Sequence, residues 1–456
     1  MNGTKKNCLA LILIVIILAM SAASTAHAVG LIATITVNPN VGNSPNGVAY
    51  DSDNGEIFLT NNVGNTVTVV SDRSNIVIAT IPVGISPNSV AFDSGKGEIF
   101  VANYGGTVSV IAGSNNTVVA TVHVEFEPYG IIYDSGKGEL FVLTYNSSST
   151  LSPDFVSVIS DSSNTVVTKV PAGNIPYGGP YGGGLEWQIG LDCIAYDSGK
   201  GEVFITNYYS GTVSVISDST NDVVATAQVG VDPYGIVYDS LKNEVFVTND
   251  GSSTVSVISD RSNSVVATVG VGAQLTTEQN SGAQPYRIAY DSGKGEVFVA
   301  NPISNTVSVI SDSNNTVVAA VPVGTYPCSV TYDPGKGDIF VINSFSGLSP
   351  PTVTVISDIS NTLFANVTVA FGGLPCGLVY DSGKSEMFAT NAGDGTVYVL
   401  SDSSAPSTSP AVPEFTNETL ISLLLVMAAM SFCALALALK KIRLNYSGSK
   451  KPKGNA

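Results

Sequence analysis

Histidine is nearly absent from this chain, with 2 copies among 456 residues. His27 lies in an N-terminal segment that we expect to be cleaved, which leaves His123 as the single histidine of the remainder. A metal site built from several imidazoles is therefore excluded, and a Ser-His-Asp triad would depend on His123 alone. We expect neither a metal nor a cofactor.

Basic residues are scarce as well, with 19 Lys and Arg against 36 Asp and Glu and a formal net charge of -17. All 36 acidic residues but only 11 basic ones lie between the two apolar ends of the chain, so this middle region carries a net charge of -25. Such a surface repels phosphate groups, which argues against a nucleic-acid partner.

Cysteine is also sparse, and 5 copies are too few for a disulfide-built scaffold. Cys8 and Cys433 lie in the apolar ends, so three cysteines remain outside them. Two of these three, Cys328 and Cys376, occupy equivalent places in consecutive repeats. A disulfide between them is predicted if their Cα atoms come within about 7 Å of each other.

Repetition dominates the sequence. An aromatic residue followed by Asp recurs eight times with a basic unit of about 42 residues, and insertions lengthen three of the seven intervals. In the copy around Tyr290, alternating apolar runs at 287–290, 296–300, 306–310 and 316–323 are separated by short turns. Each repeat is therefore predicted to form four antiparallel strands. The eight aromatic residues are Tyr50, Phe92, Tyr133, Tyr196, Tyr238, Tyr290, Tyr332 and Tyr380.

Sheets that are apolar on both faces must stack on one another, and a period of about 40 residues is typical of propeller blades. The eighth copy ends after residues 396–400 without a fourth strand, whereas residues 31–37 resemble a fourth strand with no third strand before them. We therefore predict an all-β, eight-bladed β-propeller over residues 29–402. Its last blade combines three C-terminal strands with one N-terminal strand; a seven-bladed ring is the alternative.

The end of the second strand carries a recognisable motif. Phe246-Val247-Thr248-Asn249 resembles the motif of the YVTN-type β-propeller repeat family, with variants at 204–207, 298–301 and 388–391. The third copy departs from it, with Thr144 in the place of Asn. The resemblance covers residues 31–402. It implies a propeller on an archaeal or bacterial cell surface, including surface-layer-associated proteins, and it implies no single activity.

The two ends predict export and anchoring. Residues 1–28 combine two lysines, an apolar core and an Ala-His-Ala cleavage site, as in a signal peptide; an uncleaved N-terminal anchor is the alternative. A Ser/Pro/Thr-rich stalk is predicted at 403–419, a transmembrane helix at 420–439 and a basic cytoplasmic tail at 440–456. This arrangement places the propeller on the extracellular face of the cell membrane. Pro413-Glu414-Phe415 resembles the PEF-type sorting signal of archaeal exported proteins, which implies a sortase that exchanges the helix for a lipid anchor; both anchors stay open.

Loop lengths predict which face of the propeller binds a partner. The turns after the first and third strands barely vary, whereas insertions at 145–154, 172–189, 272–285 and 344–351 all fall on the opposite face. Binding residues concentrate on variable loops of a rigid scaffold. One insertion holds the only Trp, and this aromatic, glycine-rich loop could grip a sugar or a protein, or simply pack over the ring centre. Its aromatic residues are Tyr177, Tyr181 and Trp187.

A second candidate is the position four residues before each repeated aromatic, at the start of the innermost strand. It varies while the rest of the repeat does not, which suits either a binding site at the ring mouth or plain solvent exposure. Arg287 is the one basic residue beside it. The eight residues are Asn46, Asn88, Tyr129, Asp192, Tyr234, Tyr286, Cys328 and Cys376.

Other repeated polar residues are interpreted as structural. The Asn that ends most second strands is expected to bond its own turn. The loop at Asp51 does not have the spacing of a calcium-binding EF-hand and is read as a hairpin turn. Sequons predict glycosylation at Asn115, Asn146, Asn314, Asn366 and Asn417.

These observations favour a membrane-anchored binding module for adhesion or cell-envelope interactions, with a glycan or protein partner. The alternative is an exported hydrolase or lyase with an acidic site at the ring mouth, to which Glu186 and Asp192 could contribute.

Overall fold

The computed structural model describes residues 29–37, 45–145, 154–173, 193–272, 284–343, 351–369 and 375–401, without the side chains of residues 375 and 376. All of these residues belong to one compact unit, Ala28–Ser403. The predicted signal peptide, stalk, transmembrane helix and tail lie outside this part of the chain. Within it, no helix is long and apolar enough to span a membrane.

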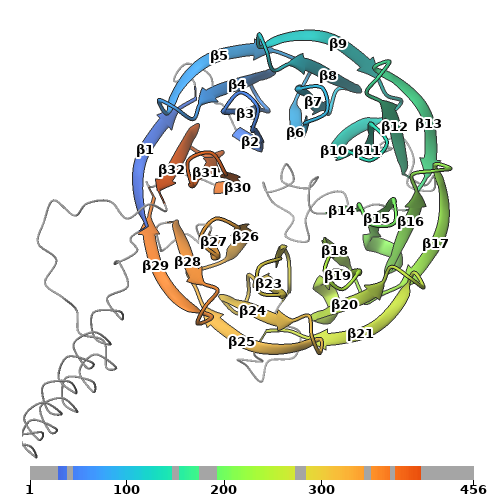
Figure 1. Cartoon of the computed structure of the whole chain (residues 1–456), viewed down its shortest axis with the longest axis vertical. Helices are drawn as coiled ribbons and strands as arrows, with labels where there is room; N and C mark the ends of the chain where they lie inside the picture. The colour runs from blue at the N-terminus through green and yellow to red at the C-terminus, as the bar shows by residue number, and fades with distance from the viewer. Residues whose placement is uncertain are drawn as a thin grey trace, which may run out of the picture. The chain divides into compact units, whose positions relative to one another are not determined.

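The described residues form eight four-stranded antiparallel sheets arranged as the blades of a ring (Figure 1). The predicted eight-bladed propeller is thus confirmed, and the seven-bladed alternative is wrong. The innermost strands are β2 (Pro45–Asp51), β6 (Pro87–Asp93), β10 (Glu127–Asp134), β14 (Ile194–Asp197), β18 (Pro233–Asp239), β22 (Ile288–Asp291), β26 (Pro327–Asp333) and β30 (Pro375–Asp381). The second strands are β3 (Glu56–Asn61), β7 (Glu98–Asn103), β11 (Glu139–Tyr145), β15 (Glu202–Asn207), β19 (Glu244–Asn249), β23 (Glu296–Asn301), β27 (Asp338–Asn343) and β31 (Glu386–Asn391).

The outer half of each blade repeats just as closely. The third strands are β4 (Thr66–Ser71), β8 (Thr107–Ala112), β12 (Phe155–Ser160), β16 (Thr212–Ser217), β20 (Thr254–Ser259), β24 (Thr306–Ser311), β28 (Thr352–Ser357) and β32 (Thr396–Ser401). The outermost strands are β5 (Ile76–Pro82), β9 (Thr117–His123), β13 (Thr165–Pro171), β17 (Asp222–Gln228), β21 (Ser264–Gly270), β25 (Thr316–Pro322), β29 (Thr362–Thr368) and β1 (Gly30–Thr36). Two 3-10 turns, η1 (Tyr208–Ser210) and η2 (Asp250–Ser252), follow β15 and β19.

The last blade is closed by the N-terminal strand, as predicted. Strand β1 pairs antiparallel with β32, from Gly30 opposite Ser401 to Thr36 opposite Thr396. The sheet order β1-β32-β31-β30 therefore joins both ends of the propeller in one blade.

The core lies between the blades rather than within any one of them. Second and third strands are buried on both faces, and each of the eight hydrophobic clusters joins residues of adjacent blades. Each second strand contributes a fully buried Phe at its third position. This packing explains why the blade sequence is apolar on both sides and cannot be stable alone. The eight residues are Phe58, Phe100, Phe141, Phe204, Phe246, Phe298, Phe340 and Phe388.

Neighbouring innermost strands approach closely at small residues. A Cβ atom on Gly235 would lie 2.5 Å from the backbone oxygen of Tyr286 in the next blade. The Oγ1 of Thr248 donates to that same oxygen at 2.9 Å and accepts the N–H of Gly235 at 2.8 Å. One hydroxyl thus joins two blades next to the ring axis. The pairs Gly47 with Thr60 and Gly377 with Thr390 repeat this bridge.

Candidate functional site

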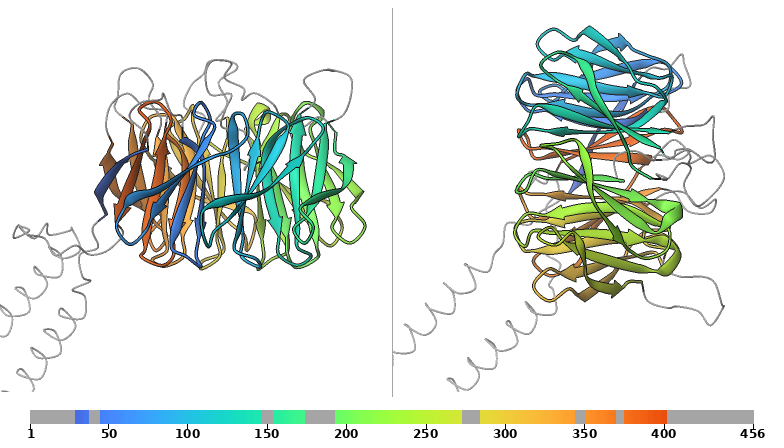
Figure 2. Two further views of the ribbon diagram at one scale, coloured as in Figure 1. Left: turned by 90° about the horizontal axis from the view of Figure 1, so that it is seen from above. Right: turned by 90° about the vertical axis from the view of Figure 1, so that its right-hand side faces the viewer.

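The two faces of the ring differ in kind (Figure 2). On one face, which we call the hairpin face, first and second strands and third and fourth strands are joined by short turns. The Asp that ends each innermost strand caps its own turn: the Oδ1 of Asp93 accepts the backbone N–H groups of Gly95 at 2.8 Å and Lys96 at 3.2 Å. Asp51 caps its turn in the same way, so its predicted role in a hairpin turn is confirmed.

Side chains of the hairpin face also connect each blade to the next. The Nζ of Lys96 donates to the backbone oxygen of Asp161 in the following blade and lies 3.8 Å from its Oδ1. Tyr133 of that blade donates to the Oδ2 of Asp161 at 3.4 Å. The Lys contact recurs from Lys137 to Asp218, Lys200 to Asp260, Lys294 to Asp358 and Lys384 to Asp72.

A second contact between blades joins an Asn to a Glu. Asn116 donates to the Oε2 of Glu56 in the preceding blade at 3.0 Å, and its positive φ of 58° lets it close the turn after the third strand. The same contact is made by Asn75 to Glu386, Asn221 to Glu139, Asn263 to Glu202, Asn315 to Glu244 and Asn361 to Glu296. The side chains of the hairpin face therefore connect adjacent blades around the ring.

One junction departs from this pattern at three residues together. Between the first two blades, Asn54 stands in place of the Lys, Phe92 in place of the Tyr, and Gly113 in place of the Asp. Asn54 instead donates to the Oδ2 of Asp51 at 2.9 Å. A Cβ atom at Gly113 would lie 2.6 Å from that oxygen, so an Asp does not fit there.

Carboxylates of the hairpin face lie close to one another, and their proton affinities change accordingly. Burial raises the pKa of Asp161 above its ordinary value, and the charge of Lys96 partly offsets this increase. Burial likewise raises the pKa of Glu56 and Glu386. Although carboxylates cluster here, no group of three or more potential ligands that could hold a metal occurs among the described residues.

At the ring axis, on the opposite and elaborated face, the described residues bring two predicted tyrosines together. The rings of Tyr234 and Tyr286, from adjacent blades, stack with centroids 4.3 Å apart and an interplanar angle of 20°. Their hydroxyls share a hydrogen bond of 2.8 Å. The guanidinium carbon of Arg287 lies 5.9 Å from the Tyr286 ring centroid, within cation–π range. These three residues form what we call the axial cluster.

The position that we expected to be either a ligand site or solvent-exposed proves to be buried wherever it is described. Tyr129, Tyr234 and Tyr286 are 1%, 0% and 6% exposed, and they share one hydrophobic cluster with Cys193. Burial raises the pKa of the Tyr129 phenol well above its ordinary value. The prediction of plain exposure is therefore wrong.

On the other side of the axis the same position is polar. The Nδ2 of Asn46 donates to the Oδ1 of Asn88 in the next blade, and the Nδ2 of Asn88 donates to the backbone oxygen of Tyr129 at 3.5 Å. Cys328 is buried, and the side chain of Cys376 lies outside the described residues, so their disulfide remains a prediction. Asp192 also lies outside them.

Other predicted residues divide in the same way. Tyr177, Tyr181, Trp187, Asn146 and Asn417 lie outside the part of the chain that the structure describes. The remaining three sequons, Asn115, Asn314 and Asn366, are exposed. His123 ends the outermost strand β9, opposite Thr107, far from the innermost strands as predicted.

The asparagines at the ends of the second strands match the prediction in part: the Oδ1 of Asn391 accepts the backbone N–H of Gly393 in its own turn at 3.2 Å, whereas others bond hydroxyls of the third strand. The Nδ2 of Asn61 donates to Thr66 Oγ1 and Thr68 Oγ1, both at 2.9 Å, rather than to its own turn. Asn249 and Asn103 do the same with hydroxyls of their third strands. These amides hold the second and third strands together, and they are buried, so they form no ring of free ligands.

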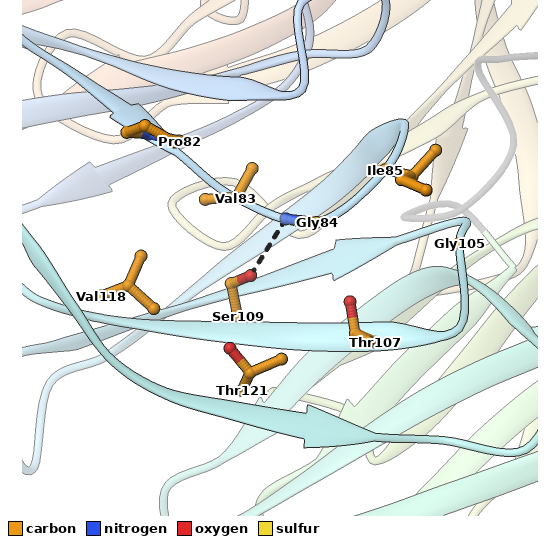
Figure 3. A pocket seen from close by; sticks show the side chains of 9 residues that line it. All are labelled: Pro82, Val83, Gly84, Ile85, Gly105, Thr107, Ser109, Val118 and Thr121. Atoms are coloured by element: carbon orange, nitrogen blue, oxygen red, sulfur yellow. Dashed lines mark hydrogen bonds between the residues drawn. The ribbon is translucent and has the colours of Figure 1, made fainter.

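A pocket of about 370 Å³ opens between the first two blades, near the outer edge of the elaborated face (Figure 3). Blade two has one residue fewer in its Tyr104-Gly105-Gly106 turn than the turns after β3, β15, β19, β23 and β31. The backbone N–H of Gly84 donates to the Oγ of Ser109 at 3.4 Å within the pocket. Its lining includes hydroxyls but no ionisable side chain, so it offers no acid–base pair. The lining residues are Pro82, Val83, Gly84, Ile85, Gly105, Thr107, Ser109, Val118 and Thr121.

Sequence reasoning missed the contacts between blades on the hairpin face. One sequence signal could have indicated these contacts: at the first junction Asn54, Phe92 and Gly113 replace the Lys, Tyr and Asp that recur elsewhere, and all three change together.

Comparison with known proteins supports the fold. No protein-family model matches the chain, and no curated protein matches its sequence. Sqt1 of Saccharomyces cerevisiae aligns with a TM-score of 0.63 at 10% identity, covering 81% of this chain and 98% of that one. The dihydro-heme d1 dehydrogenase NirN, solved in complex with DHE, aligns with a TM-score of 0.56 at 12% identity, over 75% and 67% of the two chains. Hydrazine synthase of Kuenenia stuttgartiensis has a TM-score of 0.48 at 17% identity, over 73% and 97%. At such identities the likeness concerns the fold alone.

Proposed function

We propose that this protein is an exported cell-surface propeller of the YVTN repeat type that binds a glycan or a protein through its elaborated face. The observation that carries the proposal is the difference between the two faces. The hairpin face uses its repeated side chains to fasten one blade to the next, so its residues already have a structural role. The elaborated face departs from the repeat at the axial cluster and in its loops.

The axial cluster supplies chemistry that suits recognition. Two stacked tyrosines, whose hydroxyls bond to each other, lie beside an arginine. Tyr234, Tyr286 and Arg287 are only 0%, 6% and 8% exposed, so they would support a binding surface from beneath rather than form its broad area. Among the described residues of the axial cluster, Arg287 is the one basic side chain, in a strongly acidic chain. It would therefore favour a partner with a carboxylate or another acceptor group, as in an acidic glycan.

Binding of immobilised glycans, neutral and acidic, by the full chain in mild detergent tests this proposal. We expect Arg287→Gln and Trp187→Ala each to weaken binding at least tenfold, with acidic glycans most affected by the loss of Arg287. Tyr133→Phe, on the hairpin face, is the matched control and should bind like the parent. If both variants keep the thermal midpoint and the affinity of the parent, this face is not the binding site. Failure of every glycan but capture of a protein partner lost in the same variants would identify a protein ligand.

We further propose that the chain is anchored at its C-terminal end. The uncharged segment 420–439 and the basic residues after it support a single span, and Pro413-Glu414-Phe415 supports processing by a sortase. Mass spectrometry of the protein from membranes of its host distinguishes the two. A mature N-terminus at Val29 is expected in both cases, and recovery of peptides from 440–456 would favour the retained helix over the lipid anchor.

The residues that we named for an exported enzyme, Glu186 and Asp192, lie outside the described residues.

A further inference from the structure

Every outermost strand of the ring contains a β-bulge at the same place. In β21, for example, Ala267 pairs with Val257 and Val265 pairs with Ile258, which leaves Val266 without an opposite residue. The same shift occurs in β1, β5, β9, β13, β17, β25 and β29. A bulge interrupts the regular edge of a strand and opposes the addition of another strand to it.

The bulged residue is a large hydrophobic residue in all eight blades. Each is 39% to 53% exposed, although a polar residue at a solvent-facing bulge would carry no packing penalty. Because the bulge has the same register in each blade, the eight side chains lie at the same height around the ring. We call this set the apolar belt. It consists of Ile32, Ile78, Val119, Val167, Val224, Val266, Val318 and Phe364.

The residues around the belt strengthen it. The preceding residue is also an exposed hydrophobic in several blades, as with Leu31, Val118 and Leu363 at 40%, 38% and 49%. Six of the eight outermost strands contain no Asp, Glu, Lys or Arg at all; the exceptions carry Lys169, which is paired with Glu125, and Asp222. A repeated exposed apolar surface of this kind is suited to contact with another molecule.

The charge of the chain favours the rim over the two faces for contact between copies. With a net charge of -25 between the apolar ends, two copies that approach through either face would bring carboxylates together. At the rim, they would meet over strands almost free of charge. The bulges meanwhile prevent edge-to-edge strand pairing, so contact would be made by side chains and would stay reversible.

We propose that the apolar belt is a self-association surface, through which copies of this chain contact one another rim to rim in a plane perpendicular to the ring axis. A single contact is small, because a strand of seven residues is about 23 Å long and a stable dimer buries about 800 Å² on each partner. One contact is therefore weak. Eight equivalent contact points allow several neighbours at once, and the weak contacts add when many copies are held at high local density.

The test uses sedimentation velocity of the full chain in mild detergent, produced without N-glycans because Asn366 lies two residues from Phe364. The parent should show a sedimentation coefficient that rises with concentration, and higher salt should strengthen association because it screens repulsion between the acidic copies. Replacing the five valines of the belt by Thr keeps the β-branched shape and adds a polar group. We expect this variant, V119T/V167T/V224T/V266T/V318T, to need at least tenfold higher concentration for the same association.

The matched control is V63T/V231T, since Val63 and Val231 are both 58% exposed but lie in loops of the elaborated face rather than on the rim. It should associate like the parent. Sedimentation of the parent as a monomer at all concentrations would overturn the proposal, as would unchanged association of the five-Thr variant with a parent-like thermal midpoint. The proposal is independent of ligand binding, because Arg287→Gln should alter glycan binding and leave association unchanged.

Discussion

At the scale of single residues, the junctions between blades show how a repeat adapts when one member changes. Lys96, Tyr133 and Asp161 meet across one junction, and the corresponding residues of the first junction are Asn54, Phe92 and Gly113. Since all three differ together, we expect the hydroxyl, the cation and the carboxylate to be coupled rather than independent. Residues that share a network are expected to show non-additive effects on stability.

This coupling leads to a prediction for the junction of the second and third blades. Tyr133→Phe alone should lower the free energy of unfolding by about 1 kcal/mol, because Asp161 loses a hydrogen-bond donor. The triple variant Lys96→Asn, Tyr133→Phe, Asp161→Gly, which copies the first junction, should cost less than the sum of its three single variants. Thermal and denaturant unfolding of the parent, the three single variants and the triple variant provide the measurement.

The reciprocal change serves as the control. Phe92→Tyr adds a hydroxyl to a junction that has no matching Asp and should bring no gain. Strict additivity in the triple variant would show that the three residues act separately.

At the scale of the secondary-structure element, β1 has a role that no other strand has. Its Ile35 is 6% exposed and occupies the place that Ile81 of β5, 5% exposed, has in the first blade. The two residues should therefore contribute alike, although one comes from the beginning of the chain and completes the last blade.

Truncation of these two residues tests closure of the ring. Ile35→Ala and Ile81→Ala should each lower the free energy of unfolding by about 3 kcal/mol, because each leaves a cavity in a core between blades. Denaturant unfolding of the two variants measures both losses. If Ile35→Ala left the free energy of unfolding unchanged while Ile81→Ala lowered it, β1 would not pack in the last blade.

The elements of this fold could largely be predicted from the sequence, and the side-chain contacts could not. Eight in-register repeats and an unmatched N-terminal strand were enough to predict the blade number and closure. The stacking of Tyr234 on Tyr286 was not predicted, because a repeat shows that positions are equivalent but not that neighbours face each other. The bulges were not predicted either. In the structure they correspond to one extra residue in the outermost strand, since β5 has seven residues and its partner β4 has six.

At the scale of the whole molecule, the crowded carboxylates of the hairpin face link stability to pH. Burial raises the pKa of one Asp in each of six blades above the ordinary value of about 4. A folded-state pKa above the unfolded value means that the folded protein binds more protons in between. Stability from these groups is fully present below the unfolded pKa and is lost as the pH rises through the folded pKa. The residues are Asp72, Asp161, Asp218, Asp260, Asp312 and Asp358.

The contribution of these groups to the thermal midpoint should therefore grow as the pH falls towards the ordinary Asp pKa of about 4, in the direction opposite to ordinary acid denaturation. Scanning calorimetry or fluorescence across this range measures it. Removing one of the carboxylates, as in Asp218→Asn, should flatten the dependence slightly. A pH dependence that is identical in the parent and in Asp218→Asn would contradict the assignment.

The pairing of β1 with β32 also means that the last blade can close only near the end of synthesis. Leu31 is among the first residues of the propeller to be synthesised, and its partner Leu400 is among the last. The edge of β32, or of β1, stays open until translation is almost complete. If residues 1–28 are removed on export as we propose, only Val29 precedes the paired residues. Cleavage a few residues further along the chain would therefore remove part of β1 and prevent closure of the last blade.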